Sequence, residues 1–308
     1  MKIRQQHYVW RHYLSAWEND GQLHASREGR TFTTSAANVA KQRDFYRLRL
    51  LTPLQIELVR RLAISISPPF LRDMHERLLA TFSSLPRLHA HLQSLPEGHP
   101  ARAAAEAAVI NTEEHLQTSI EQGGADHLRD LRRMDASFFE NEDSATDFLY
   151  FLCMQYLRTK NIQKRVGAAV RASKIDGVAA SAAEVEQIWP VLRHIFAVNA
   201  AYSLFADRAK FRIVFLSAPD HFPFITGDQP VLNALGQQDG LTPPTEFEPY
   251  YPLGPGLALL LTARDIFTDG RAVLSQSDVA NYNNMIARAS YELLFSSSEE
   301  ALAFCRAD

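Results

Sequence analysis

An aspartate at the end of an apolar segment is the residue of this chain whose position most favours chemistry. Asp228 lies within residues 224–231, a stretch that predicts a buried strand followed by a tight polar turn ending at Pro230. A carboxylate at the end of a buried strand can bind a cation or exchange a proton. The alternative is an Asx turn, in which the carboxylate accepts a hydrogen bond from its own backbone.

Three further polar residues could complete a site with Asp228. His7 could act as a general base or a metal ligand, or it could be a histidine whose ring is satisfied at the edge of a strand. Arg158 carries the planar fork that binds a carboxylate or phosphate through two bonds, and an internal salt bridge is its alternative role. Gln155 and Arg158 follow one apolar flank of a predicted helix, so we expect a semi-buried polar pair.

Two glutamates and two neutral polar residues extend this set. Glu114 and Glu121 are seven residues apart, so they share one helix face and could hold a metal together with Asp228. A solvated acidic face is the alternative for the two glutamates. Thr226 and Asn233 flank Asp228 and are candidate binding residues. The charged residues and the histidine of this set could instead form a buried network that is wholly structural: His7, Glu114, Glu121, Arg158 and Asp228.

The elements that must position these residues change in type along the chain. Residues 1–50 contain short alternating segments separated by glycine turns, which predicts a small β-rich opening. Residues 51–210 carry apolar side chains at helical spacing, and residues 211–308 return mainly to strands. We therefore expect an α+β fold in a single domain, residues 1–308, with a large helical middle and a C-terminal, mainly antiparallel sheet.

Prolines, glycines and apolar spacing set the expected boundaries. A helix that starts at Ala101 should end at Gly123-Gly124, and a long helix should cover residues 145–172. Pro190 should break the helix that follows, and residues 175–183 and 236–244 should form a linker and a loop. Strands are expected at 8–10, 21–25, 30–34, 212–217, 222–226, 231–233, 250–253, 257–262 and 291–296, with further helices at 53–66, 70–82, 126–133 and 278–289.

Composition indicates an ordinary soluble protein. The chain has 308 residues, with 46% hydrophobic and 22% charged residues and a net charge of -3. This charge does not favour an extended nucleic-acid surface, although it leaves nucleic acid open as a partner. Residues 151–175 contain basic side chains and no acid, which indicates either a solvated helix face or a helix that faces an anion. The basic residues are Arg158, Lys160, Lys164, Arg165, Arg171 and Lys174.

The cysteines and the N-terminus indicate a cytoplasmic location. Cys153 and Cys305 are far apart in the sequence and lack metal or redox spacing, which suits a reducing compartment. Residues 1–5 contain no apolar run that predicts a signal peptide. The longest apolar stretch, residues 148–156, is too short to cross a bilayer, so we expect no membrane partner.

The motifs of the chain resemble those of a bacterial family known as domain of unknown function 4238. Gln6-His7-Tyr8-Val9 is similar to the family's opening His-Tyr-Val-Pro motif, and residues 155–159 are similar to its Gln-x-x-Arg-Thr-Pro motif. Residues 224–231 are similar to its Phe-Ile-Thr-Ser-Asp-Asn-Pro-Val motif. The resemblance continues at residues 13–14, 38–40, 44–46, 251–253 and 281–284, and so covers nearly the whole chain. It implies no catalytic assignment, because the family has no established activity.

Three residues depart from the family pattern. Trp10 and Lys160 stand where the family has proline, and these changes affect local turns. Gly227 stands where the family usually has serine, which removes a hydroxyl group beside Asp228. If that hydroxyl takes part in chemistry, this chain is altered or inactive.

Two classes of function fit these residues. The first is a metal-dependent hydrolase acting on a phosphoester, in a nucleotide or a nucleic acid, with a divalent cation as cofactor. In this class Asp228, Glu114 and Glu121 would be ligands, His7 a ligand or general base, and Arg158 the phosphate clamp. The second class is a non-catalytic sensor or partner-binding protein in which the same residues form a structural polar core. The sequence contains no glycine-rich phosphate loop, no Gly-x-Ser-x-Gly and no His-Glu-x-x-His motif that would decide between them.

Overall fold

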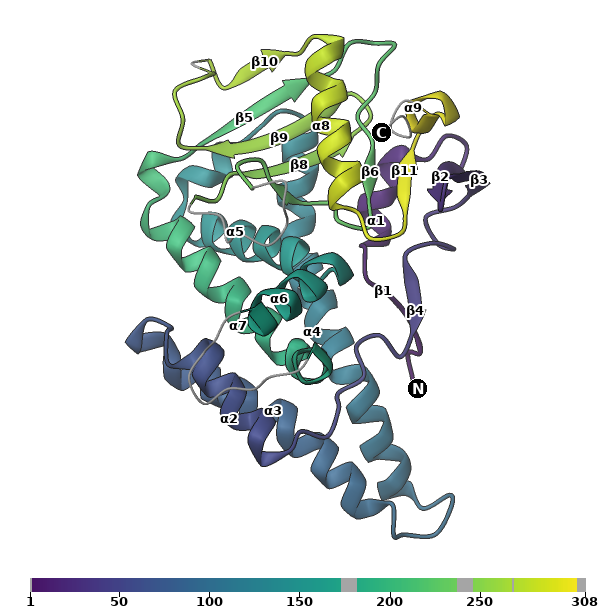
Figure 1. Ribbon diagram of the computed structural model, residues 1–308, viewed down its shortest axis with the longest axis vertical. Helices are drawn as coiled ribbons and strands as arrows, with labels where there is room; N and C mark the ends of the chain where they lie inside the picture. The colour runs from purple at the N-terminus through teal and green to yellow at the C-terminus, as the bar shows by residue number, and fades with distance from the viewer. Residues whose placement is uncertain (1, 173–181, 237–245, 268, 304–308) are drawn as a thin grey trace.

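Strands gather at one end of the molecule and helices extend to the other in the computed structural model (Figure 1). The structure describes residues 2–172, 182–236, 246–267 and 269–303. The predicted α+β class is confirmed, with a small N-terminal β segment, a helical middle and a mostly antiparallel C-terminal sheet. The predicted loop at 236–244, the predicted linker at 175–183 and Cys305 lie wholly or mostly outside the described residues.

Helix starts in the middle of the chain follow from prolines and polar caps. Pro53 occupies the first turn of α2, where Thr52 and Gln55 form a capping box. Asn141 caps α5 by accepting a hydrogen bond from the Ser144 backbone N–H. The helices are α2 (Pro53–Val59), followed by a π-helical segment (Arg60–Ile64), α3 (Pro69–Leu92), α4 (Pro100–Arg132), α5 (Glu142–Leu157), α6 (Lys160–Ala172) and α7 (Ala182–Ala206).

Several predicted helix boundaries are wrong, including the end of the helix expected at 70–82, which continues to Leu92, and the helix expected at 126–133, which is the end of α4. Helix α4 continues through Gly123 and Gly124 instead of ending there, because Gly124 lets α4 approach α5 closely. The predicted helix over 145–172 is two helices, α5 and α6, and Arg158 is the C-cap of α5. Helix α7 continues through Pro190, because buried residues on both sides of the proline hold the helix in the core.

The two adjacent glycines of α4 provide a matched test of this close approach. A Cβ atom at Gly124 would lie 2.3 Å from the Phe151 ring, whereas one at Gly123 would meet nothing within 4 Å. We expect Gly124→Ala to lower the free energy of unfolding by about 1–3 kcal/mol through overpacking. Gly123→Ala should raise it by about 0.5–1 kcal/mol, because alanine is the better helix former. Urea unfolding of both variants checks this, and equal effects would contradict the packing explanation.

The structure describes a five-stranded sheet with the order β10-β5-β9-β8-β7. Its pairs are antiparallel except for β10 with β5, which are parallel. The predicted strands 212–217 and 257–262 are confirmed at both boundaries, and β10 was not predicted. The strands are β5 (Arg212–Ser217), β7 (Leu232–Asn233), β8 (Pro249–Gly254), β9 (Leu257–Thr262) and β10 (Arg271–Val273).

A second sheet joins the two ends of the chain in the order β3-β2-β11-β6. Strand β11 lies between β2 and β6 and pairs antiparallel with both, so the N-terminal segment packs directly on the C-terminal one. A two-stranded ladder of β1 and β4 stands apart from these sheets (Figure 1). The remaining elements are β1 (Gln5–His7), α1 (Arg11–Leu14), β2 (Leu23–Arg27), β3 (Arg30–Thr34), β4 (Lys41–Arg43), β6 (Thr226–Gly227), α8 (Gln276–Ala289), β11 (Leu294–Ser296) and α9 (Glu299–Ala303).

Helix α5 lies at the centre of the larger hydrophobic core. Phe148, Phe151 and Leu152 are fully buried, and so is Cys153 beside them. Because α5 is covered on almost every side, its polar residue Gln155 is carried into the interior with no exposed surface. Within the described residues, none of the helices combines the length and the apolar character that a membrane span requires.

Candidate functional site around Arg158

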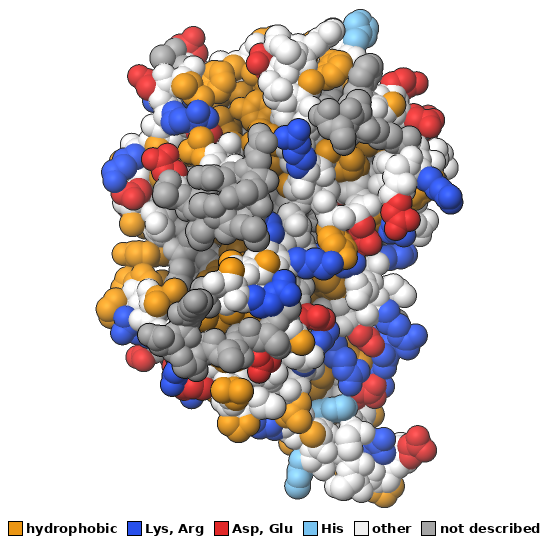
Figure 2. Space-filling view, in the orientation of Figure 1, with side chains coloured by type: hydrophobic (Ala, Val, Ile, Leu, Met, Phe, Trp, Pro, Cys, Tyr) orange, Lys and Arg blue, Asp and Glu red, His pale blue; other side chains and the backbone are white. Residues whose placement is uncertain are grey.

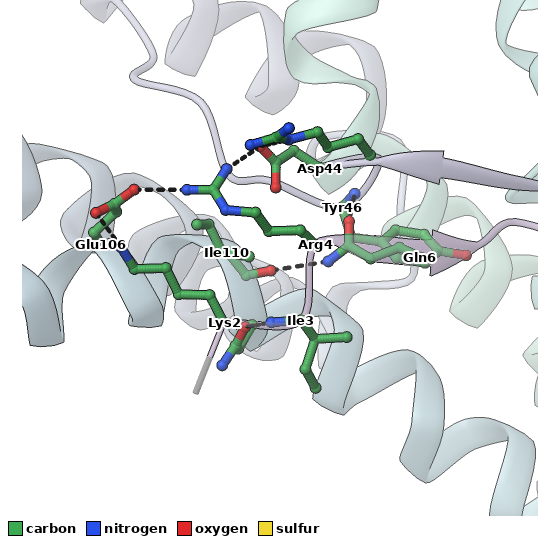
Figure 3. Close-up of polar contacts among 10 residues, drawn as sticks. Lys2, Ile3, Arg4, Gln6, Asp44, Tyr46, Glu106 and Ile110 are labelled. Carbon is green, nitrogen blue, oxygen red and sulfur yellow. Dashed lines mark hydrogen bonds and ion pairs between the residues drawn. The ribbon is translucent and has the colours of Figure 1, made fainter.

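Arg4 links the N-terminal segment to α4 through ion pairs with two acidic residues. Arg4 donates from Nη1 to Asp44 Oδ2 at 2.6 Å and from Nη2 to Glu106 Oε1 at 2.9 Å (Figure 3). Glu106 belongs to α4, and Asp44 follows β4. The arginine therefore ties the β1–β4 ladder to the long helix and fixes where β1 lies.

Gln6, the residue before His7, also links β1 to neighbouring segments, through buried hydrogen bonds. Its side-chain Nε2 donates to the carbonyl of Ile110 at 3.1 Å, and its Oε1 accepts from the backbone N–H of Tyr46 at 2.7 Å (Figure 3). Gln6 is fully buried, so both bonds are shielded from water. Gln6 thereby fixes the position of β1, whose last residue is His7.

Arg158 is the centre of a buried polar group. Its side chain has no exposed surface, and Nη1 donates to Glu121 Oε1 at 2.6 Å and more weakly to Gln117 Oε1 at 3.5 Å. Nε and Nη2 are buried and have no hydrogen-bond partner among the described residues. The Nε–Nη2 edge of a guanidinium presents two parallel N–H groups, which is the geometry that binds a carboxylate or phosphate.

Other buried polar atoms of this group are also unpaired. Both side-chain atoms of Gln155, Nε2 of His7, Oε2 of Glu114 and the hydroxyl of Tyr251 have no partner in the part of the chain that the structure describes. Burial is the main influence on the pKa of His7, Glu114 and Tyr251, and the Arg158 charge acts on each of them as well. Because an unsatisfied buried polar atom costs about 1–3 kcal/mol, these atoms are available to a polar ligand.

The group runs from the interior to the surface. Arg158 and Gln155 are fully buried, Glu121 has 15% of its side chain exposed, and His7 and Glu114 are half-buried. Burial lowers the pKa of His7, so the imidazole is neutral near pH 7 and can accept a proton. Burial raises the pKa of Glu114 to about 7, and the Glu121 carboxylate adds to the rise while Arg158 opposes it. Near neutral pH, His7 can therefore accept a proton and Glu114 can donate one.

The raised pKa of Glu114 predicts a dependence of stability on pH. A carboxyl with a pKa of about 7 in the folded chain and 4.5 in the unfolded chain binds more protons when folded between these values. The wild type should therefore lose stability as the pH rises from about 4.5 to about 7. Glu114→Gln should remove this contribution, so the variant should melt at a higher temperature than wild type at pH 8 and at a similar temperature at pH 4.5. Melting curves across this range check it, and parallel curves would contradict it.

The Asp228 carboxylate accepts hydrogen bonds from the backbone of a segment that is distant in the sequence. It accepts from the backbone N–H groups of Tyr291 at 2.6 Å, Glu292 at 2.9 Å and Leu293 at 3.2 Å. Burial raises its pKa to about 6, although these three hydrogen bonds act in the opposite direction. None of these bonds joins Asp228 to the group around Arg158. Through these hydrogen bonds the carboxylate links the turn after β6 to the segment between α8 and β11.

Thr226 and Asn233 also make bonds within the fold. The Thr226 hydroxyl lies 2.7 Å from the Tyr13 hydroxyl, and Asn233 donates to the Glu246 carbonyl at 2.7 Å. Asn233 Oδ1 accepts from the backbone N–H groups of Leu235 and Glu248. The structure thus pairs the predicted Arg158 with Glu121, and the Arg158 charge acts on His7 and Glu114. Gln155 is buried on the same helix as Arg158 without a bond to it, and Asp228, Thr226 and Asn233 are engaged in other bonds. Over residues 2–172, 182–236, 246–267 and 269–303, no group of three or more His, Cys, Asp or Glu side chains is arranged to hold a metal ion.

A neighbouring buried ion pair was not predicted from the sequence. Glu113 Oε1 accepts from Arg193 Nε at 2.7 Å and lies 3.1 Å from His194 Nε2, and all three residues are buried. Two sequence signals could have identified this group. Glu113 shares one face of α4 with Gln117 and Glu121 at spacings of four, and Arg193-His194 interrupts an apolar run in α7.

The structure shows the surroundings of the three residues that were expected to depart from the family motifs. Trp10 precedes α1 with φ near -59°, a value that proline also adopts, and its ring packs on Phe151. Lys160 is the first residue of α6, a position that accepts proline, and it forms an ion pair with Glu292 at 3.2 Å. A Cβ atom at Gly227 would lie 1.9 Å from Ser290 Oγ, so the Ser290 hydroxyl fills the space beside Asp228.

The fold and this site define an α+β protein in which a buried arginine is surrounded by unpaired polar groups. The chain belongs to the DUF4238 family, described as proteins of unknown function, whose model matches residues 5–300. The resemblance inferred from the sequence motifs is therefore confirmed. No curated protein and no solved structure matched the chain.

Proposed function

We propose that the protein is a hydrolase acting on a small phosphoester whose phosphoryl oxygens bind the Nε–Nη2 edge of Arg158. The observation that carries this proposal is that edge itself, which is fully buried and lacks a partner among the described residues. Because Glu121 already holds the other side of the guanidinium, Arg158 loses little conformational entropy when its free edge binds two oxygens. The depth of the site and the net charge of -3 favour a small ester, such as a nucleotide, over a nucleic acid.

The neighbouring side chains supply the proton transfers of such a reaction. His7 Nε2 accepts a proton from water as its oxygen attacks phosphorus. The bond from phosphorus to the leaving oxygen breaks, and protonated Glu114 gives its proton to that oxygen. Arg158 compensates the charge on the phosphoryl oxygens throughout.

The alternative function is a non-catalytic sensor or partner-binding protein with a structural polar core. The bonds of Asp228 and the Glu113–Arg193–His194 group support it, because these charged side chains stabilise the fold. A ligand that binds at Arg158 without being hydrolysed would fit this alternative.

The proposal predicts a large and specific loss in Arg158→Lys. Lysine keeps the charge but loses the fork, so we expect kcat/KM for a small phosphate ester to fall about 100-fold. The measurement is turnover of p-nitrophenyl phosphate and of nucleoside monophosphates, with and without magnesium or manganese. Arg264→Lys is the matched control, because Arg264 pairs with Glu248 elsewhere and should keep wild-type activity.

Gln155→Met separates a ligand role from a structural one. Both amide atoms of Gln155 lack partners in the described part of the chain, so methionine removes no protein hydrogen bond and the fold should persist. Weaker phosphate binding in a stable Gln155→Met variant supports the site. Wild-type turnover in Arg158→Lys would reject the hydrolase, and phosphate binding without turnover of any ester would favour the sensor.

A further inference from the structure

A cavity of about 660 Å³ lies between α6, α7 and the segment after β4. Neither Arg158 nor His7 nor Glu114 lines it, so it is distinct from the site described above. Phe45 lines this cavity, while the next residue, Tyr46, is influenced by the charges of both Arg158 and Arg193. The segment around Tyr46 is therefore near both sites.

The lining of this cavity is strongly basic. Five of its side chains are Arg49, Lys160, Lys164, Arg171 and Arg193, against the acids Asp44 and Glu186. Lys and Arg side chains gather near the middle of the face in Figure 2, where Figure 1 places α6. A concave basic surface of this kind attracts an anion.

The basic side chains that line the cavity differ in whether an acidic residue already forms an ion pair with them. Arg193 pairs with Glu113, Arg49 lies 3.6 Å from Glu186, and Lys160 lies 3.2 Å from Glu292. Lys164 has no carboxylate partner within the described ranges, and its Nζ lies 2.5 Å from the Tyr291 hydroxyl and above that ring. Lys164 and Arg171 are seven residues apart, so they share one face of α6. These two side chains are available to bind an anion in the cavity.

A buried indole supplies a second, independent observation. Trp189 lines the cavity and is only 2% exposed, yet its Nε1 has no hydrogen-bond partner among the residues that the structure describes. A buried indole N–H ordinarily donates to an acceptor. The rings of Phe45 and Tyr291 also line the cavity. The walls thus offer aromatic surface and one unused donor beside the cations.

We propose that this cavity binds a nucleoside monophosphate. The phosphate binds Lys164 and Arg171, and the base contacts Phe45 and Trp189, whose Nε1 donates to a ring or sugar acceptor. The volume lies within the range of small-molecule sites, which is roughly 300–1,000 Å³. This inference goes beyond the proposed hydrolase, because it assigns a second site that Arg158 does not form.

Calorimetric titration with AMP, adenosine and inorganic phosphate tests the proposal. AMP should bind more tightly than adenosine or phosphate alone. Lys164→Gln/Arg171→Gln should raise the Kd for AMP at least about tenfold, because two charge-assisted contacts are lost. Trp189→Phe keeps an aromatic ring but removes the donor and should raise the Kd about threefold or more. Arg61→Gln/Lys210→Gln, which removes two exposed charges elsewhere, should leave it within twofold of wild type.

Three results would overturn the proposal. They are the absence of saturable AMP binding, a wild-type Kd in Lys164→Gln/Arg171→Gln, and phosphate binding as tight as that of AMP. Arg158→Lys separates this site from the proposed hydrolase, because AMP should still bind that variant in the cavity between α6 and α7. Loss of AMP binding in Arg158→Lys would instead assign the nucleotide to the Arg158 site and also overturn the inference.

Discussion

Asp228→Ala is expected to lower the free energy of unfolding by about 3 kcal/mol or more. The substitution removes the acceptor for three backbone N–H groups, those of Tyr291, Glu292 and Leu293, in a part of the molecule where Asp228 is only 2% exposed. A buried donor without a partner costs about 1–3 kcal/mol, and here the Leu293 bond is buried and the other two are partly buried, so the three together amount to a large share of a typical domain stability. Urea unfolding with tryptophan fluorescence measures the change.

Two other variants define what this result means. Asp228→Asn keeps one acceptor oxygen and should lose less stability than Asp228→Ala. Asp220→Ala, an exposed aspartate in the connection between β5 and β6, should remain within about 0.5 kcal/mol of wild type. If Asp228→Ala unfolds like wild type but loses a metal-dependent activity, Asp228 is a metal ligand and the structural explanation is wrong.

Glu113→Leu is expected to be at least as destabilising, by about 3–5 kcal/mol. The substitution leaves the buried Arg193 guanidinium without its carboxylate partner, and an uncompensated charge in the interior carries this cost. His194 loses the same partner. The double variant Glu113→Leu/Arg193→Met should regain most of the lost stability, because it removes both charges and replaces them with apolar side chains of similar size.

The double-mutant cycle makes this second prediction specific. If the two residues act as a pair, the cost of both changes together is far below the sum of the single changes. Additive costs would show that each residue has an independent role. Chemical denaturation of the wild type, the two single variants and the double variant gives the coupling energy directly.

Local patterns in the sequence determined the class of fold and many of its elements. The period of two in residues 30–34 and the apolar runs at 212–217 and 257–262 depend only on neighbouring residues, and β3, β5 and β9 have these bounds. The prediction failed at Gly123-Gly124, where glycines usually end a helix, because the deciding contact is with Phe151 on another helix. The motifs that suggested the family were also local, and the family model matches residues 5–300.

The candidate site was only partly determined by the sequence, because its geometry depends on partners far apart in the chain. Spacing placed Gln155 with Arg158 and Glu114 with Glu121, but only packing of α5 against α4 brings Arg158 to Glu121. The sequence favoured Asp228 as the working carboxylate, whereas the structure gives its oxygens three N–H groups from residues 291–293. A carboxylate in a local turn and one that binds a distant backbone look alike in sequence, and only the tertiary structure distinguishes them.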